Sequence, residues 1–183
     1  MEWLILGIIG INVFVFFLPY IVSFGANPFN SFSVFSSYFA KVNSKISDGE
    51  WYRLFTSNFL HADFIHLAVN MLSLFQIGPT VLNTFKMPGF LLIYIVSGLS
   101  GSLLSYFLSN NVSVGASGAI FGLVGALLAV SIRFGNFGLL SNIALIIVLN
   151  FGVSLSPGSR IDNYGHLGGL ISGTLLGFLL VIK

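Results

Sequence analysis

The chain has no cysteine among its 183 residues and carries very little charge. The absence of cysteine excludes disulfide frameworks, thiolate metal sites, iron–sulfur clusters and a cysteine nucleophile. Asp, Glu, Lys and Arg together make up only 7% of the residues, whereas a soluble domain usually carries about 25%. Because so few charges cannot solvate the surface of a globule of this size, a free cytoplasmic enzyme is excluded.

Runs of basic residues are missing as well. Seven Lys and Arg stand against five Asp and Glu, which gives a formal net charge of +2, and they are scattered singly along the chain. A nucleic-acid-binding protein gathers its Lys and Arg into a patch or stripe. We therefore expect no nucleic-acid partner.

What the chain has in abundance is apolar sequence, since 56% of its residues are hydrophobic and its mean hydropathy is +0.99. A helix needs roughly 20 mostly apolar residues to cross about 30 Å of hydrocarbon. Six windows of about that length are present: 3–24, 59–77, 90–108, 115–132, 137–155 and 165–182. They predict an all-α polytopic membrane protein, in which residues 1–183 form a single domain with six transmembrane helices.

The first window and the stretch after it need separate arguments. The apolar run of the first window exceeds the roughly 7 to 15 residues of a signal-peptide core and lacks a basic start, so we expect a retained anchor. In the following loop, residues 25–58, Phe29, Phe32, Phe35 and Phe39 recur near helical spacing among Ser and Asn. This pattern favours an amphipathic segment associated with the membrane surface, and an ordinary structured loop is the alternative.

Six spans place both termini on the same side of the membrane. In the short loops, Lys86, Arg133 and Lys183 then fall on the side of the termini, against Arg160 on the other. Because basic residues in short loops are retained in the cytoplasm, the termini are expected to be cytoplasmic. The basic residues of the long first loop count the other way, but we discount them because that loop is expected to lie on the membrane.

Ionisable and strongly polar side chains inside spans are costly and are functional candidates by default. They gather at the N-terminal ends of the second, fourth and sixth windows: His61, Asp63, His66 and Asn70 in the second, Ser117 in the fourth and His166 in the sixth. Because even-numbered spans all run in the same direction, these groups share one depth near the face opposite the termini.

The chemistry of these groups predicts a nucleophilic site. His66 and Asn70 are four residues apart and project from one helix face. The Ser117 hydroxyl beside the His166 imidazole would be the minimal activated nucleophile. Since Asp162 lies four residues before His166 in a loop, a Ser/His dyad without an orienting Asp is the economical interpretation. A helix cap, a polar membrane anchor and an interhelical amide are the corresponding alternatives for Ser117, His166 and Asn70.

Two stripes of small residues accompany the Ser and His residues. They are Gly118, Gly122, Gly125 and Ala129 in the fourth window and Gly165, Gly169, Gly173 and Gly177 in the sixth. Such stripes let helix backbones approach closely in lipid. If they pack together, Ser117 and His166 face each other near the top of the contact.

Three sequence blocks carry a resemblance to a known family. They are residues 49–54 (GEWYRL) leading to 59–71 (FLHADFIHLAVNM), residues 115–122 (GASGAIFG) and residues 162–169 (DNYGHLGG). In this order, on the second, fourth and sixth windows, they are highly specific. From about Gly49 to Gly177 the chain resembles the rhomboid intramembrane serine proteases, which implies a six-helix rhomboid-like bundle with a membrane-associated first loop.

The resemblance implies an intramembrane serine endopeptidase that cleaves transmembrane segments of membrane proteins and needs no metal or other cofactor. Ser117 would be the nucleophile and His166 the general base and acid. Asn70, His66 and the Ser117 backbone N–H would stabilise the oxyanion. Phe121 fills a position that is often Tyr and would pack on the catalytic His.

The resemblance also assigns structural roles. The Trp51–Arg53 segment would belong to a membrane-embedded first loop. Close helix packing is expected at Gly115, Gly118, Gly122, Gly165, Gly169 and Gly173. As a departure, Gly78-Pro79 is not followed by the Glu that the family often has, so a structural contact in the next loop is expected to be missing, and no soluble domain is expected to flank the core.

The span count matches the minimal bacterial form of the family. This implies a multi-pass protein of the bacterial cell membrane, with cytoplasmic termini, an active site towards the outer face, and the lipid bilayer and transmembrane proteins as partners. Two alternatives stay open. One is a catalytically inactive rhomboid-like protein that binds transmembrane helices. The other is a metal site built from His61, His66, His166 and Asp63, although His61 and His66 lack the one-turn spacing with an intervening Glu that metallopeptidases use.

Overall fold

The computed structural model describes residues 3–22, 35–154 and 161–181, and within them the regular structure is helical. One isolated antiparallel β-bridge, between Lys41 and Ser113, is the single extended pairing in these ranges. The long helices are α1 (Trp3–Val22), α5 (Phe64–Leu108), α6 (Ser117–Phe134), α7 (Phe137–Ser154) and α8 (Asn163–Leu180). The short ones are α3 (Asn43–Ser47), α4 (Arg53–Thr56) and the 3-10 helix η1 (Ser57–Phe59).

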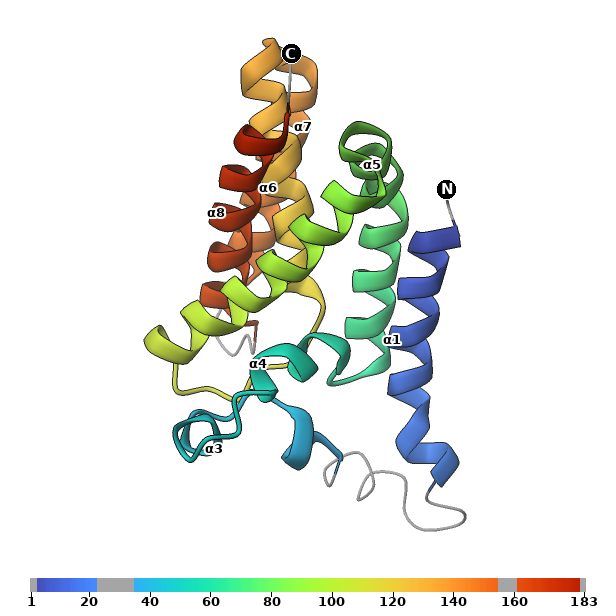
Figure 1. Ribbon diagram of the computed structural model, residues 1–183, viewed down its shortest axis with the longest axis vertical. Coiled ribbons are helices and arrows are strands. Elements are labelled where there is room, and N and C mark those ends of the chain that lie inside the picture. The colour runs from blue at the N-terminus through green and yellow to red at the C-terminus, as the bar shows by residue number, and fades with distance from the viewer. Residues whose placement is uncertain (1–2, 23–34, 155–160, 182–183) are drawn as a thin grey trace.

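Helix α5 is bent so sharply that its two arms run in opposite directions (Figure 1). The bend lies at Lys86, whose backbone has φ 58° and ψ 177°. Pro88 follows in the first turn of the second arm, where its fixed φ and missing N–H are tolerated. The start of α1, the bend and the end of α8 lie at one end of the bundle, whereas α5, α6 and α8 all begin at the other (Figure 1).

The predicted end of the second span at Gly78-Pro79 is wrong, because the helix continues through both residues to the bend. Gly78 lies close to α1, since a Cβ built on it would be 3.0 Å from Ile5 Cδ1. Pro79 is accepted inside the helix because neighbouring helices and local adjustments can satisfy the freed carbonyl.

The start of the second span also differs from the prediction. Helix α5 begins at Phe64 because Asp63 caps it, with Oδ1 accepting from the His66 backbone N–H at 2.8 Å. His61 therefore lies ahead of the helix and not within it. The fourth and sixth helices begin and end about two residues from their predicted limits. Four residues named above lie outside the described residues, namely Phe29, Phe32, Arg160 and Lys183, and so do the predicted window limits at 24, 155 and 182.

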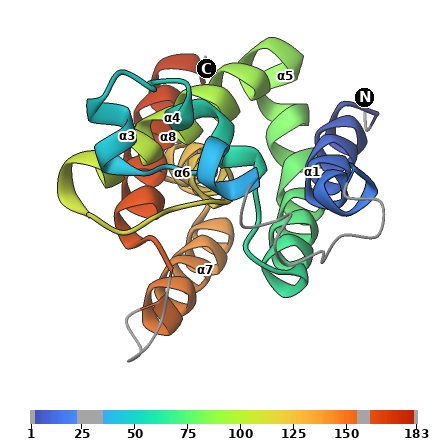
Figure 2. The ribbon, with the colours of Figure 1, turned by 90° about the horizontal axis from the view of Figure 1, so that it is seen from below.

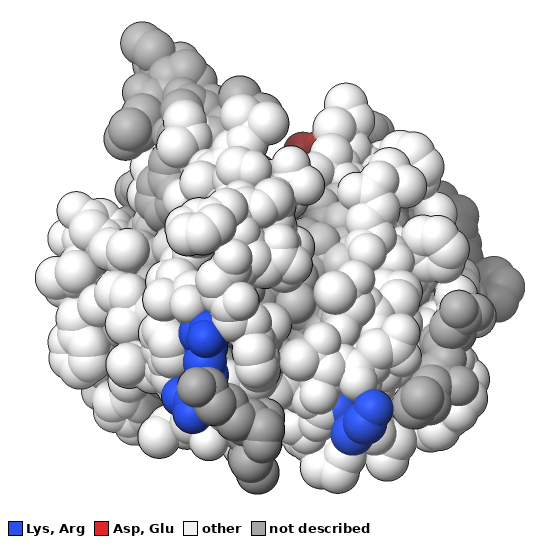
Figure 3. All heavy atoms as spheres, turned by 90° about the horizontal axis from the view of Figure 1, so that it is seen from above, with Lys and Arg blue, Asp and Glu red and all other residues white. Residues whose placement is uncertain are grey.

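Among the described residues, three helices, α1, α5 and α6, are long and apolar enough to cross a membrane by length and composition. Large apolar side chains such as Trp3 and Phe14 on α1 and Phe75 on α5 are exposed. Figure 3, viewed from the end where α1 begins and α8 ends, shows a surface with very few charged atoms. The protein is an all-helical membrane protein.

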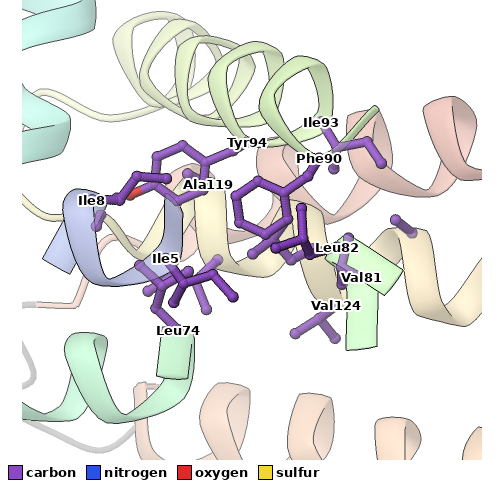
Figure 4. Packing of buried hydrophobic residues seen from close by; sticks show 14 of the residues in the cluster. Ile5, Ile8, Leu74, Val81, Leu82, Phe90, Ile93, Tyr94, Ala119 and Val124 are labelled. Carbon is purple, nitrogen blue, oxygen red and sulfur yellow. The ribbon is translucent and has the colours of Figure 1, made fainter. Parts of the chain in front are cut away.

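The apolar core lies where α1, both arms of α5 and α6 meet (Figure 4). Its fully buried members include Ile5 of α1, Leu74 and Val81 of the first arm, Phe90 of the second arm and Leu123 of α6. Lipid tails are as apolar as these side chains, so close van der Waals packing is what holds them together.

Helix α6 lies in the middle of the bundle, with α8 and the second arm of α5 packed against it, while α7 packs along α6 and projects away from the rest (Figure 2). The contact of α6 with α8 is a contact between backbones. A Cβ on Gly169 would collide with the carbonyl oxygen of Gly118, and one on Gly173 would collide with that of Gly122. The two small-residue stripes therefore face each other.

We expect Gly169→Val to separate α6 from α8, because the Gly118 carbonyl occupies the space that the new side chain needs. Overpacking of this kind costs about 1–3 kcal/mol, measurable as a lower unfolding free energy in detergent. The matched control is Gly10→Val in α1, since no heavy atom lies within 4 Å of a Cβ built there. Equal melting of the two variants would show that the α6–α8 contact tolerates a branched side chain.

Candidate active site

The first turns of α6 and α8 place the two central residues of the site. Ser117 is the first residue of α6 and is half-buried, whereas His166 lies in the first turn of α8 and is 6% exposed. Asp162 caps α8, because its Oδ1 accepts from the Gly165 backbone N–H at 2.9 Å. Such a cap satisfies an N–H that has no partner within the helix, and so fixes where α8 and His166 begin.

Three backbones converge beside these residues. A Cβ on Gly118 would lie 3.4 Å from the Gly165 carbonyl oxygen, and a Cβ on Gly101 would lie 3.4 Å from the Gly118 Cα. Any side chain larger than hydrogen at Gly101 would also collide with the Gly165 carbonyl. Ser117 and His166, each next to one of these glycines, therefore lie at the same level where α6 and α8 meet.

The His166 ring is held by a ring of the neighbouring helix. Phe121, one turn after Ser117 on α6, stacks on the imidazole with ring centroids 4.2 Å apart and an interplanar angle of 15°. Offset or parallel stacking of this kind stabilises an aromatic pair by about 0.5–1.5 kcal/mol beyond area burial. The stack orients the imidazole from the same helix that carries the Ser117 hydroxyl.

A small polar cavity opens beside Ser117, with a volume of about 20 Å³. This is enough for about one water molecule. Its wall is formed by α5, α6, the start of α8, and the segments that precede α5 and α6: Ser57, Asn58, Gly101, Ser102, Ser113, Val114, Gly115, Ser117, Gly118, Asp162 and Gly165. Ser117 thus lines a small cavity together with several other polar residues.

His66 and Asn70 approach the site from the first arm of α5. A Cβ on Gly115 would lie 2.8 Å from Cε1 and Nε2 of His66 and 3.8 Å from Nδ2 of Asn70. Gly115 also has φ +129°, a conformation that other residues rarely adopt. The structure therefore places Gly115 against two side chains in the segment before α6, and not at the helix–helix contact that was expected for it.

His61, which the sequence placed in the second span, is buried ahead of α5 with its ring centroid 5.1 Å from that of His66. Burial, with a smaller effect of His66, lowers the pKa of His61 to about 3, so its imidazole is neutral at pH 7. In the described part of the chain, no three or more His, Cys, Asp or Glu side chains are arranged to hold a metal ion.

The first loop is tied down by Arg53, which is 2% exposed. Its guanidinium donates to the carbonyls of Ala40 (2.9 Å) and Ser37 (2.8 Å) and pairs with Glu50 at 2.7 Å. The neighbouring Trp51 is 54% exposed, as suits an amphipathic ring at the membrane surface. The Trp51–Arg53 motif therefore combines an exposed ring with a buried cation that closes the loop.

Sequence reasoning missed Lys41, whose side chain is fully buried in the same loop. A lone lysine in a segment expected to lie on the membrane is costly unless its charge is satisfied, and this signal alone could have singled it out. The pairing of the Gly115 N–H with the Ser57 carbonyl (2.9 Å) was equally invisible in the sequence, because it joins loops that lie far apart in the chain.

Comparison with known proteins shows the family to which this chain belongs. The rhomboid domain family matches residues 48–183. Rhomboid protease GluP of Bacillus subtilis (strain 168) is 46% identical over 137 residues, which cover 73% of this chain and 27% of that protein. RHOMBOID-like protein 4 of Arabidopsis thaliana is 41% identical over 150 residues, which cover 78% of this chain and 37% of that protein. The matched region is thus roughly a quarter to two fifths of each relative, and the chain belongs to the rhomboid family.

Proposed function

We propose that this chain is an intramembrane serine endopeptidase that cleaves transmembrane segments of membrane proteins with a Ser117/His166 dyad. The observation that carries the proposal is the meeting of α6 and α8, where Phe121 stacks on His166 one turn from Ser117. The relationship to a protein named a rhomboid protease supports it. The nucleophile and its base come from α6 and α8, whose backbones are in direct contact and leave no space for a side chain between them.

For the topology, we propose that residues 1–183 form one domain with six spans, namely α1, the two arms of α5, α6, α7 and α8. The termini would be cytoplasmic and the site would face the outside of a bacterial cell membrane. The positions of Lys86 at the bend and Arg133 in the last turn of α6 support this orientation, since both lie at the end of the bundle where α1 begins.

The proposed reaction is acyl transfer. His166 accepts the proton of Ser117 as Oγ bonds to the peptide carbonyl carbon, and the carbonyl electron pair moves onto oxygen. As that pair returns, the C–N bond breaks and His166 delivers the proton to the leaving amine. His166 then takes a proton from a water molecule as the water oxygen bonds to the acyl carbon. When the bond between that carbon and Ser117 Oγ breaks, His166 returns the proton to Oγ and the new carboxyl end is released.

The oxyanion would be held by His66, Asn70 and the Ser117 backbone N–H. The first N–H groups of a helix have no acceptor within it, so the Ser117 N–H at the start of α6 is available to a ligand. His66 and Asn70 both lie against Gly115, two residues before Ser117. Donors that are fixed in place before charge develops act most strongly in a dry site.

The proposed substrates are transmembrane helices, which reach the site through the lipid bilayer. Such a helix hides its carbonyls in intrahelical hydrogen bonds, and the cavity beside Ser117 has a volume of only about 20 Å³. The segment to be cut must therefore unwind locally before a carbonyl reaches Oγ. Helix-destabilising residues and small side chains near the cleaved bond would favour this step.

Replacing Ser117 or His166 by Ala should reduce cleavage of a model transmembrane substrate in proteoliposomes by about a million-fold or to background, because members of a catalytic unit fail together. The double variant should lose no more than either single one, and only proteins with both residues should react with a fluorophosphonate. Ser131→Ala is the matched control, since that hydroxyl is buried at the far end of α6 and donates to the Leu127 carbonyl.

A wild-type protein that binds transmembrane helices but neither cuts them nor reacts with the fluorophosphonate would identify a catalytically inactive relative. Cleavage by pure Ser117→Ala protein would remove Ser117 from the mechanism altogether.

Activity should survive EDTA and phenanthroline, because the proposed chemistry uses only side chains and the backbone of this chain. Activity assays before and after chelation, together with metal analysis of the purified protein, test this. Stoichiometric zinc whose removal abolishes cleavage and whose return restores it would instead support a metal site.

Asn70→Ala should lower turnover by about a hundred- to a thousandfold, the usual effect of removing one oxyanion donor, with little change in KM and with no greater loss of stability than the control variant. Asn12→Ala is the matched control. Both amides are buried and donate to the carbonyl four residues earlier, Asn70 to His66 (3.0 Å) and Asn12 to Ile8 (2.8 Å).

For Asn12→Ala we expect a loss of about 0.6–2 kcal/mol in stability, as for intramembrane hydrogen bonds generally, with unchanged chemistry. If Asn70→Ala behaves in the same way, its amide is a packing group and not an oxyanion donor.

A further inference from the structure

The segment that delivers Ser117 to the site is residues 109–116, between the end of α5 and the start of α6. Its regular backbone pairing is with the first loop. The Lys41 N–H donates to the Ser113 carbonyl (3.0 Å), the Ser113 N–H donates to the Lys41 carbonyl (3.1 Å), and the Gly115 N–H donates to the Ser57 carbonyl (2.9 Å). The first loop therefore holds the backbone of the residues that lead to Ser117.

The side chain of Lys41 reinforces this pairing. Its Nζ donates to the backbone carbonyls of Ser105 (3.1 Å), Ser109 (2.9 Å) and Asn111 (3.1 Å), which accounts for all three of its N–H donors. The side chain is 0% exposed. Ser105 lies in the last turn of α5, Ser109 is the residue that caps its C-terminus and Asn111 follows it. The C-terminal end of a helix favours a cation, so Lys41 joins the end of α5 to the start of segment 109–116.

Asn43, two residues later, extends the same contact. Its Nδ2 donates to the carbonyls of Tyr106 (2.9 Å) and Ser109 (2.9 Å) and lies 3.3 Å from Asn110 Oδ1. Both views of the ribbon show α3, which Asn43 begins, beside the end of α5 (Figures 1 and 2). We call the contacts of Lys41 and Asn43 with residues 105–113 the loop clamp.

The charge of Asp162 links the loop clamp to the candidate active site. Burial lowers the pKa of the Lys41 ammonium, and the negative charge of Asp162 opposes that shift. Asp162 lines the same cavity as Ser117 and Ser113 and caps α8 at His166. The carboxylate that fixes the start of α8 thus also favours the charged form of the residue that fixes the approach to α6.

We propose that Lys41, assisted by Asn43, is a positioning residue for the reaction: it holds segment 109–116 so that Ser117 Oγ and the Ser117 N–H keep their productive positions. This role rests on the proposed function. Only three residues separate Ser113, paired with Lys41, from Ser117, and a misplacement of about 1 Å can cost a hundredfold in rate.

The first test compares Lys41→Met, which keeps an apolar side chain of similar length and removes the ammonium, with two controls. Lys45→Met makes the same change at an exposed lysine of the same loop, and Ile46→Ala removes buried apolar packing from that loop without touching the loop clamp. Lys41→Met should lower kcat at least tenfold with KM changed less than twofold. At equal loss of melting temperature, Ile46→Ala should keep its kcat, and Lys45→Met should match wild type.

The second test is amide hydrogen exchange, which needs no activity. In Lys41→Met, exchange of residues 113–117 should become at least tenfold faster, while peptides from the α6–α8 contact keep their protection. Lys41→Arg, which retains a cation, should recover part of both kcat and protection. If Lys41→Met does not fold, Asn43→Ala, which removes fewer contacts, must show the same two effects in weaker form.

Equal kcat and equal exchange for Lys41→Met and Ile46→Ala at matched stability would overturn the positioning role and leave Lys41 as a purely structural cap. Failure of the proposed function gives a different result, because wild type would then behave like Ser117→Ala in cleavage and in fluorophosphonate labelling. If only the positioning role of Lys41 is wrong, the wild-type protein still cleaves its substrate and still reacts with the fluorophosphonate.

Discussion

The contact between the backbones of α6 and α8 is the constraint on which the rest of this structure depends. In lipid there is no hydrophobic force to draw helices together, so association needs close van der Waals contact. Gly169 and Gly173 allow it by leaving room for the carbonyls of Gly118 and Gly122. Because the helices touch along this line, a ring on α6 can lie flat against an imidazole on α8. Small residues therefore give the site its rigidity, although none of them takes part in the chemistry.

A second constraint governs the parts that are not helical. Backbone groups outside helices need partners wherever water is scarce, and here they find them in a loop that precedes all but the first long helix. Arg53 closes that loop on itself, while Lys41 and Asn43 join it to the end of α5. The two buried cations, Arg53 and Lys41, thus donate to backbone carbonyls, and Arg53 also pairs with the carboxylate of Glu50. The loop follows α1 and precedes α5 in the chain, and it also supports the candidate site.

The sequence predicted the family, the apolar helices and the shared level of Ser117, His66 and His166, because hydropathy and helix direction are local properties. It failed where a residue's role is set by a distant neighbour. Gly78-Pro79 has the composition of a helix end, but the helix continues through both residues, and Gly78 lies against Ile5 of α1. Gly115 reads as a helix-packing glycine, but it leaves room for His66. The partners of Lys41 are carbonyls more than 60 residues later in the chain, which nothing in the sequence around it shows.

The bend at Lys86, where the backbone is not helical, joins the two helical arms of α5 and reverses the chain. A loop could absorb an extra residue, but a continuous helix transmits it. One residue inserted after the bend would rotate every later position of the second arm by about 100°. That rotation would turn Gly101 away from α6 and α8 and carry the carbonyls of Ser105 and Ser109 off Lys41. The length of this arm is therefore constrained as well as the small residues that it presents: Gly101 has no room for a side chain, and an inserted or deleted residue would misalign every contact that follows it.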